Sequence, residues 1–214
     1  MRKISIALVT ALLATACAAA PEDQTGTEQT TRKATAPAPE GAGSIESVSY
    51  TGTACNATST STSISPDKQA VTSIFSDFIA AAGAGTPPAQ AKRNCIVMMD
   101  VKVPAGWQYS LESIDYRGFA GLDRDVTASR QSLYVISGSP VHVTPQARFK
   151  GEISDNYEHN DVSPDAPGVW SPCGGGQTLW IATQTEVNNG NRAARGGQLA
   201  VDSLDTELQW RRCQ

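Results

Sequence analysis

The stretch of residues 95–103, CIVMMDVKV, decides the fold class, because its apolar side chains recur at every second position. The residues on the apolar face are Cys95, Val97, Met99, Val101 and Val103. Asp100 and Lys102 lie on the opposite face. A period of two residues is typical of a β-strand with one side buried. The sequence therefore predicts a strand here, with one face in the core of a sheet.

Similar alternation recurs along the chain, in stretches separated by residues that favour turns. The further predicted strands cover residues 45–50, 107–116, 131–137, 141–150, 178–187, 198–204 and 207–212. Pro, Gly and Asn residues lie between strands, as in 104–106, 138–140, 188–191 and 196–197. Many short strands with no helical period between them predict an all-β fold, an antiparallel β-sandwich of jelly-roll-like form.

Two stretches depart from simple alternation. Residues 71–82 place apolar side chains at helical spacing, yet VTSIFSDF is rich in strand formers, so this segment is either a helix or a strand. In residues 107–116 the large side chains change face between Leu111 and Ile114. Such a change predicts a β-bulge near Glu112 and Ser113.

The N-terminus has the order of a secretory signal: Met-Arg-Lys, an apolar run to Ala16, and then small residues. The run is too short to span a bilayer as a helix. Residues 13–17, LATAC, resemble the lipobox of bacterial lipoproteins, although Ala14 stands where a large aliphatic residue is usual. We therefore expect residues 1–16 to be a lipoprotein-type signal peptide with Cys17 acylated. Cleavage after Ala16 or Ala20, with release of a secreted protein, is the alternative.

Residues 17–44 form a Thr-, Ala- and Pro-rich acidic stretch with almost no large apolar side chain, which predicts a disordered linker. Residues 45–214, about 170 in all, fit one β-sandwich domain with a sizeable core. Without Arg2 and Lys3 the chain has 15 basic and 21 acidic residues, a net charge of −6. That balance argues against nucleic acid as a partner, because such binding requires a basic surface.

A set of motifs spread over residues 45–213 resembles a secreted family known as domain of unknown function 4360. The motifs are SPD (65–67), RNC (93–95), VPAG (103–106), DYRGFA (115–120), FKG (149–151), VWSPCG (169–174) and WRRC (210–213). Their order and spacing make the set more specific than any single motif. The resemblance implies a small exported protein with an all-β domain and two cysteine pairs, and it implies no activity.

The five cysteines divide into an even set and one left over. Cys55, Cys95, Cys173 and Cys213 allow three disulfide connectivities, among which the sequence does not choose. Joining Cys55 to Cys95 and Cys173 to Cys213 is the option with two local loops. Cys17 remains without a partner, which favours its acylation in an oxidising compartment. We interpret the four paired cysteines as structural and not catalytic.

The chain has one concentrated polar segment, residues 154–167, SDNYEHNDVSPDAP. Oxygen-rich loops hold calcium, so Asp155, Glu158 and Asp161 are candidate ligands, although the spacing is not that of an EF-hand. A solvated acidic loop is the alternative. Zinc or copper would require more imidazole or thiolate groups than His142 and His159 supply, so we expect no other cofactor.

Catalytic motifs are sparse. The Gly-x-Ser-x-Gly elbow of many serine hydrolases does not occur. A glycosidase needs two carboxylates, and the most suggestive one is Asp115 in DYRGFA, with Arg117 on the same face of a strand. A structural ion pair explains these two residues equally well.

The aromatic residues provide the remaining candidates for ligand binding. Trp107, Trp180 and Trp210 lie in alternating strands, where we expect them to fill the core, whereas Tyr157 and Trp170 lie in loop-like chain and are expected at the surface. The sequence thus favours a non-catalytic surface or envelope module that binds a glycan or an envelope protein. A polysaccharide hydrolase and a structural coat component are the alternatives. We expect a lipoprotein of the outer membrane or cell surface, held to the membrane by its lipid anchor, or else a secreted protein.

Overall fold

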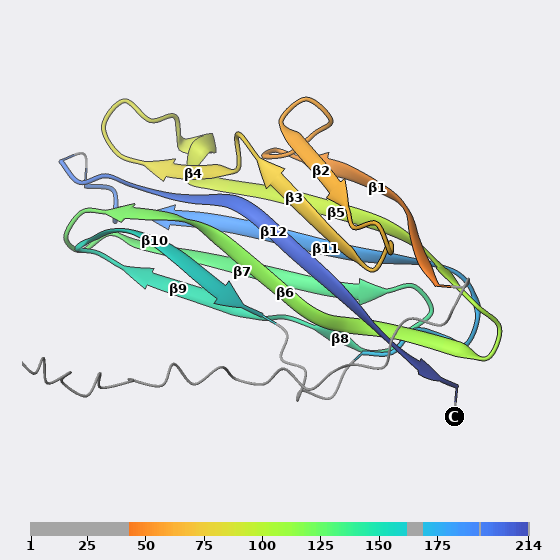
Figure 1. The fold of residues 1–214 in the computed structure, drawn as a ribbon. Coiled ribbons are helices and arrows are strands. Elements are labelled where there is room, and N and C mark those ends of the chain that lie inside the picture. The colour runs from red at the N-terminus through yellow and green to blue at the C-terminus, as the bar shows by residue number, and fades with distance from the viewer. Residues whose placement is uncertain (1–42, 162–168, 193, 214) are drawn as a thin grey trace, which may run out of the picture. The chain divides into compact units, whose positions relative to one another are not determined.

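The computed structural model describes residues 43–161, 169–192 and 194–213 (Figure 1). The predicted signal peptide, Cys17 and the linker up to residue 42 lie outside the described residues. The described chain is all-β, with one short 3-10 helix, η1 (Pro88–Ala91). The strands are β1 (Ser44–Gly52), β2 (Thr60–Ile64), β3 (Ala70–Phe75), β4 (Ile79–Ala82), β5 (Lys92–Val103), β6 (Trp107–Leu122), β7 (Thr127–Ile136), β8 (His142–Val143), β9 (Gln146–Lys150), β10 (Ile153–Asn160), β11 (Gly175–Asn188) and β12 (Gly197–Arg212). Within this part of the chain no helix is long and apolar enough to span a membrane.

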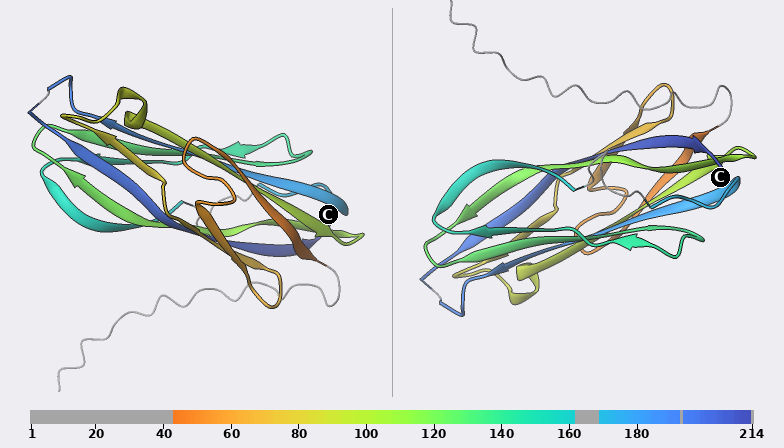
Figure 2. Two further views of the ribbon diagram at one scale, coloured as in Figure 1. Left: turned by 90° about the horizontal axis from the view of Figure 1, so that it is seen from above. Right: turned by 90° about the horizontal axis from the view of Figure 1, so that it is seen from below.

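The strands form two antiparallel sheets that pack face to face (Figure 2). Sheet A has the order β1-β5-β11-β7, and β8 and β9 both pair with β7. Sheet B has the order β10-β6-β12-β3-β2, and β4 also pairs with β12. From β5 onward the chain crosses repeatedly between the sheets, so that β5, β7 and β11 lie in one and β6, β10 and β12 in the other. This is the strand order of a jelly roll, which confirms the predicted β-sandwich.

Alternation along the long strands builds the core between the sheets. The inner side of β5 buries the apolar residues of the 95–103 stretch, and Met99 is fully inaccessible. Leu179 and Ile181 of β11 and Leu204 of β12 pack into the same apolar cluster. A smaller cluster around Val126 and Leu199 fills another part of the sandwich. Side chains of the opposite parity face solvent, and these outer faces carry the candidate sites.

Bulges explain two features of the predicted strands. The pairing of β6 with β12 skips Glu112, which confirms the predicted bulge. A second register shift lies between Val201 and Ser203 in β12. This strand is continuous from Gly197 to Arg212, whereas the sequence predicted two separate strands there.

The structure decides one segment that the sequence left open and corrects the interpretation of another. Residues 71–82 contain β3 and β4 and not a helix, because Val71 and Phe75 alternate with outward residues, and Ile74 is 55% exposed. Residues 153–160, predicted as part of a loop, form strand β10 at the edge of sheet B, where they pair with β6. The edge position explains why this strand has a polar sequence, since charged side chains protect an edge from further pairing.

The four described cysteines form two disulfides, Cys55–Cys95 and Cys173–Cys213. These are the local pairs, each closing a separation of 40 residues. Cys173 precedes β11 of sheet A and Cys213 follows β12 of sheet B, so this bridge joins the two sheets. The loop-entropy model gives a contribution of about 4 kcal/mol for each bridge.

Candidate functional site

The outer face of sheet B brings together Asp115, Arg117 and Glu158. Arg117 donates a hydrogen bond to Glu158 at 3.0 Å and forms an ion pair with Asp205. The hydrogen bond to Glu158 is the main reason that the pKa of Arg117 is raised. Asp115 accepts a hydrogen bond from the Asn160 side chain at 2.7 Å. These contacts describe an exposed ion-pair network, and a catalytic or binding role for Asp115 and Arg117 stays a prediction.

The three candidate calcium ligands are not brought together. Glu158 points to the outer face of β10, opposite in parity to Asp155 and Asp161. Asp161 accepts two hydrogen bonds from the Arg130 guanidinium, at 2.5 and 2.6 Å. Among the described residues there is no group of three or more His, Cys, Asp or Glu side chains that could hold a metal ion. Calcium binding by Asp155, Glu158 and Asp161 stays a prediction.

The two aromatic residues expected at loop surfaces lie in different surroundings. Tyr157 lies in strand β10, where its ring packs 4.9 Å from that of Phe149 and its hydroxyl donates to the carbonyl of Ala200 at 2.7 Å. Burial is the main reason that the pKa of Tyr157 is raised. Trp170 lies in irregular chain before β11, with the Arg211 guanidinium 3.9 Å above its ring.

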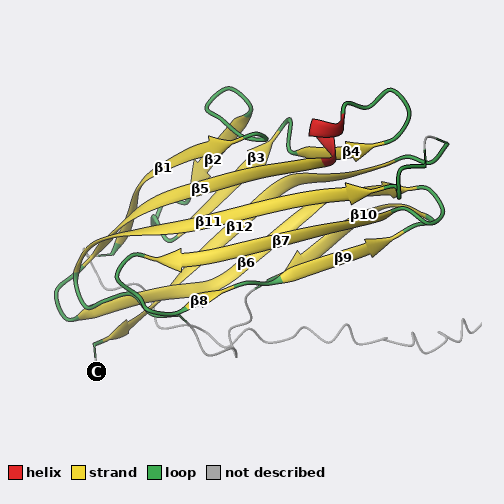
Figure 3. Ribbon diagram, turned by 180° about the vertical axis from the view of Figure 1, so that it is seen from behind, coloured by secondary structure: helices red, strands yellow, loops and turns green. Residues whose placement is uncertain are grey.

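Of the three tryptophans expected in the core, Trp210 is buried, and Trp107 is half-buried against the core. The expectation is wrong for Trp180, which is only half-buried and lies on the outer face of β11. Figure 3 shows β11 between β5 and β7 in sheet A. Leu179 and Ile181, its neighbours along β11, are fully buried, so alternation turns the indole toward solvent. Trp180 lies two positions from the polar Thr178 and so shares its face of the strand, and this spacing could have shown from the sequence that Trp180 faces outward.

Strand register places apolar side chains around Trp180 on this outer face. Met98 of β5 and Val135 of β7 lie directly beside Trp180 in the next two strands. The neighbouring row joins Ile96, Ala182 and Leu133, and Leu133 is 37% exposed. We call these two rows the apolar band; its members are Ile96, Met98, Leu133, Val135, Trp180 and Ala182.

Polar rows border the apolar band on both sides along the strands. One is an amide row, which register builds from Gln146, Gln131, Gln184 and Asn94. The side chains of Gln131 and Gln184 have no hydrogen-bond partner in the part of the chain that the structure describes. On the other side Asp100 accepts hydrogen bonds from Ser47 at 2.7 Å and Thr178 at 2.9 Å. These hydrogen bonds lower the pKa of Asp100, and the one from Ser47 has the larger effect.

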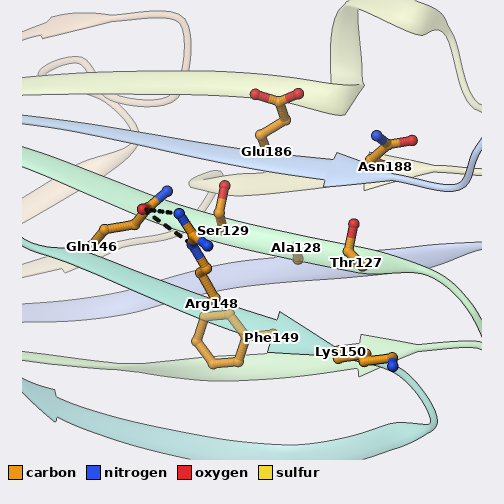
Figure 4. Close-up of a pocket in the computed structure, with 9 residues that line it drawn as sticks. All are labelled: Thr127, Ala128, Ser129, Gln146, Arg148, Phe149, Lys150, Glu186 and Asn188. Carbon is orange, nitrogen blue, oxygen red and sulfur yellow. Dashed lines mark hydrogen bonds between the residues drawn. The ribbon is translucent and has the colours of Figure 1, made fainter.

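Beyond the amide row the outer face is hollowed, with a volume of about 480 Å³ (Figure 4). This polar hollow is lined by Thr127, Ala128, Ser129, Gln146, Arg148, Phe149, Lys150, Glu186 and Asn188. Its side chains come from β7, β9 and β11, and the side-chain oxygen of Gln146 accepts two hydrogen bonds from Arg148, at 3.2 and 3.0 Å. Gln146 belongs to both the amide row and the hollow, so the two features are continuous.

The outer face of sheet A thus combines a half-buried indole, amide groups without partners among the described residues, and a charged hollow. Amides donate and accept hydrogen bonds at once, and an indole offers a flat apolar surface. The combination suits an amphipathic ligand with many hydroxyl groups. Neither the apolar band nor the hollow was identified from the sequence.

Comparison with known proteins places the chain among proteins of undefined activity. The model of the family described as domain of unknown function (DUF4360) matches residues 42–213. An uncharacterized secreted protein of Arthroderma benhamiae is 34% identical over 175 residues, which cover 79% of this chain and 71% of the relative.

Two solved structures resemble the chain weakly. TmCBM61 in complex with β-1,4-galactotriose is 11% identical with a TM-score of 0.26, and the match covers 79% of this chain and 91% of that one. The enzymatically active domain of tailspike protein 4 of bacteriophage CBA120 is 9% identical with a TM-score of 0.21, covering 78% of this chain and 19% of that one.

Proposed function

Since the chain belongs to the DUF4360 family, whose description assigns no activity, we propose from its own geometry that it is a non-catalytic module that binds glycan chains on the outer face of sheet A. The similarity to a secreted relative supports the conclusion that the protein is exported. Glycans of a cell envelope or of the surroundings are therefore the ligands that such a module would meet.

The position of Trp180 carries the proposal. Its indole lies in the middle of the apolar band on a solvent-facing sheet, where the core gains nothing from it. A sugar ring has an apolar C–H face and a rim of hydroxyl groups. The C–H face would stack on Trp180 while the hydroxyls pair with Gln131 and Gln184, whose side chains lack partners in the described chain.

The carboxylates of the opposite face argue for binding over hydrolysis. Asp115 and Asp205 lie side by side across β6 and β12. Asp205 is engaged by Arg117 and by the Thr72 hydroxyl at 2.6 Å, and Asp115 by Asn160. Neither belongs to the face that carries Trp180, Gln131 and Gln184.

Attachment to a membrane through acylated Cys17 is part of the same proposal. The two disulfides use all four cysteines of the described chain, so Cys17 has no cysteine left to pair with. Acylation removes the reactive thiol, and the several acyl chains of a mature lipoprotein hold a membrane stably. Residues 17–44 would then act as a spacer between anchor and domain.

The test is retention of the exported full-length protein on a panel of insoluble polysaccharides and cell-wall preparations. We expect retention without release of sugars into the supernatant. Trp180→Ala should weaken binding about tenfold or more, because truncating a central aromatic contact removes a large share of binding energy.

Trp170→Ala is the matched control, since it removes an indole from irregular chain outside sheet A. The proposal is contradicted if Trp180→Ala is retained on the polysaccharides as well as the unaltered protein is. It is also contradicted if only Trp170→Ala loses retention. Release of sugars would favour the hydrolase instead.

A further inference from the structure

The polar hollow carries positive charge that no carboxylate of the described chain neutralises. Arg148 and Lys150 are two positions apart in β9 and therefore lie on the same face of the strand. Both side chains line the hollow on the outer face (Figure 4). Neither forms an ion pair with a described residue. The one carboxylate that lines the hollow, Glu186, pairs with Lys92 at 3.6 Å. Glu186 therefore already has a counter-charge, and the two cations of β9 remain free for a ligand.

Three other exposed arginines of the domain, in contrast, are paired with carboxylates. Arg117, Arg124 and Arg192 each lie within 3.3 Å of a carboxylate oxygen. The chain as a whole is acidic, with a formal net charge of −4. An unpaired Arg and Lys in one hollow of an acidic protein are thus a local feature that general charge balance does not explain.

The Arg148 guanidinium is also held in place. Its Nε and one Nη donate to the Gln146 side-chain oxygen, which leaves the other Nη free to donate. Gln146 is in turn set beside Gln131 by the register of β9 and β7. A guanidinium oriented in advance loses less entropy when it binds a carboxylate, and its hydrogen bonds to a charged acceptor are stronger than those to a neutral one.

The hollow lies in line with the proposed sugar platform. Glu186 is six residues from Trp180 along β11, a distance of about 20 Å in a strand. A ligand that touches both must be a chain of several sugar units, because one ring is far shorter than that. Hydroxyl groups from Thr127 and Ser129 and the Asn188 amide line the hollow between the charged groups.

We propose that the polar hollow is a subsite for the carboxylate of an acidic sugar, so that the chain binds polysaccharides containing uronic acid, with Arg148 and Lys150 contacting the carboxylate. This inference rests on the proposed glycan-binding function and names its ligand class. Hydroxyls of the same sugar would bond to Ser129 and Asn188, while neighbouring units extend over the amide row to Trp180.

The test measures the affinity of the exported full-length protein for polygalacturonate and for its fully methyl-esterified form, by gel retardation and calorimetry. We expect binding to polygalacturonate at least about tenfold tighter than to the ester, because esterification removes the charged acceptors. Arg148→Gln with Lys150→Gln should abolish this preference.

Lys68→Gln with Arg124→Gln is the matched control, because it removes one exposed lysine and one exposed arginine from turns outside the strands of sheet A and should leave the preference intact. Glu186→Gln should change the affinity for polygalacturonate in the opposite direction. It removes the one carboxylate of the hollow and frees Lys92, so binding to polygalacturonate should tighten by about two- to threefold. Since all these side chains are at the surface, circular dichroism should show each variant folded.

The possible failures are distinguishable. Equal binding to the two polymers, with no effect of Arg148→Gln and Lys150→Gln, overturns the uronate subsite and leaves the glycan module standing. The uronate subsite is also overturned if the control double variant loses the preference for polygalacturonate to the same extent, because the overall charge of the protein then explains the affinity. Binding to neither polymer nor to any polysaccharide of the wider panel overturns both proposals.

Discussion

Asp161→Ala is expected to be among the most destabilising single substitutions in this domain. Arg130 is the largest fully buried side chain among the described residues, with no exposed surface, and only 6% of the Asp161 side chain is exposed. The carboxylate accepts two hydrogen bonds from Arg130 and one from the Tyr134 hydroxyl. Removing it leaves a guanidinium buried against the Tyr116 ring, 3.7 Å away, without a counter-charge.

The expected loss follows from that burial. Breaking a buried ion pair by removing one partner costs about 3–5 kcal/mol. A domain of this size loses roughly 2–4 °C of melting temperature for each kcal/mol, so Asp161→Ala should melt on the order of 10 °C lower. Combining Asp161→Leu with Arg130→Met removes both charges and should recover most of the loss, because no uncompensated charge then remains.

Urea unfolding followed by tryptophan fluorescence measures these differences. Asp155→Ala is the matched control, because it removes an exposed carboxylate from strand β10 and should change stability by less than about 0.5 kcal/mol. The reasoning fails if the free energy of unfolding of Asp161→Ala is within about 1 kcal/mol of that of the unaltered protein. This limit is about one quarter of the expected loss. The reasoning fails equally if the double variant is no more stable than Asp161→Ala.

Four further predictions test other parts of the structure. Replacing Cys173 and Cys213 by Ser should cost about 4 kcal/mol in the free energy of unfolding, measured with urea; a loss under about 1 kcal/mol would show that the bridge between the sheets is dispensable. Gly118→Ala should lower the melting temperature because the new methyl group would meet the Ala200 carbonyl and the Tyr157 hydroxyl, whereas Gly176→Ala, with open space around it, should not; equal melting temperatures would refute the close packing of β10, β6 and β12. Desolvation by burial lowers the pKa of His159, so the unfolded chain binds a proton that the folded chain does not, and stability should fall as the pH drops below about 6.5; a His159→Gln variant with the same pH profile would exclude this histidine as the cause. Cys17→Ser should move the protein from the membrane fraction to the medium, and an unchanged membrane fraction would contradict lipid anchoring.

Local periodicity was sufficient to predict most strands. Residues 95–103 alternate cleanly because β5 is covered on one face only, and the change of face near Glu112 marked a real bulge. The same rule misread β12, where the bulge between Val201 and Ser203 moves the buried parity from Leu199 and Val201 to Leu204 and Leu208. A single strand with a parity change looks like two strands in the sequence, because only the partner strand reveals its continuity.

Residues 153–160 show where composition misleads. Their polar side chains suggested a loop, but the backbone pairs with β6 along its whole length, and β10 forms the edge of sheet B. Tyr157 and His159 turn inward and pack against Phe149 of sheet A, with the His159 ring stacked on it. An edge strand has one partner and favours charged residues on its open side, so its pattern resembles that of a solvated loop.

The candidate site required register, which the sequence does not contain. Parity alone showed that Trp180 shares a face with polar residues of β11. Its neighbours Met98 and Val135 come from segments about 82 and 45 residues away in the sequence, and only the pairing of three strands sets them side by side. The same pairing confines apolar side chains to two rows and places polar rows on both sides. A solvent-facing sheet with no partner would have no reason to concentrate its large apolar residues in this way, so the band is best explained as a contact surface.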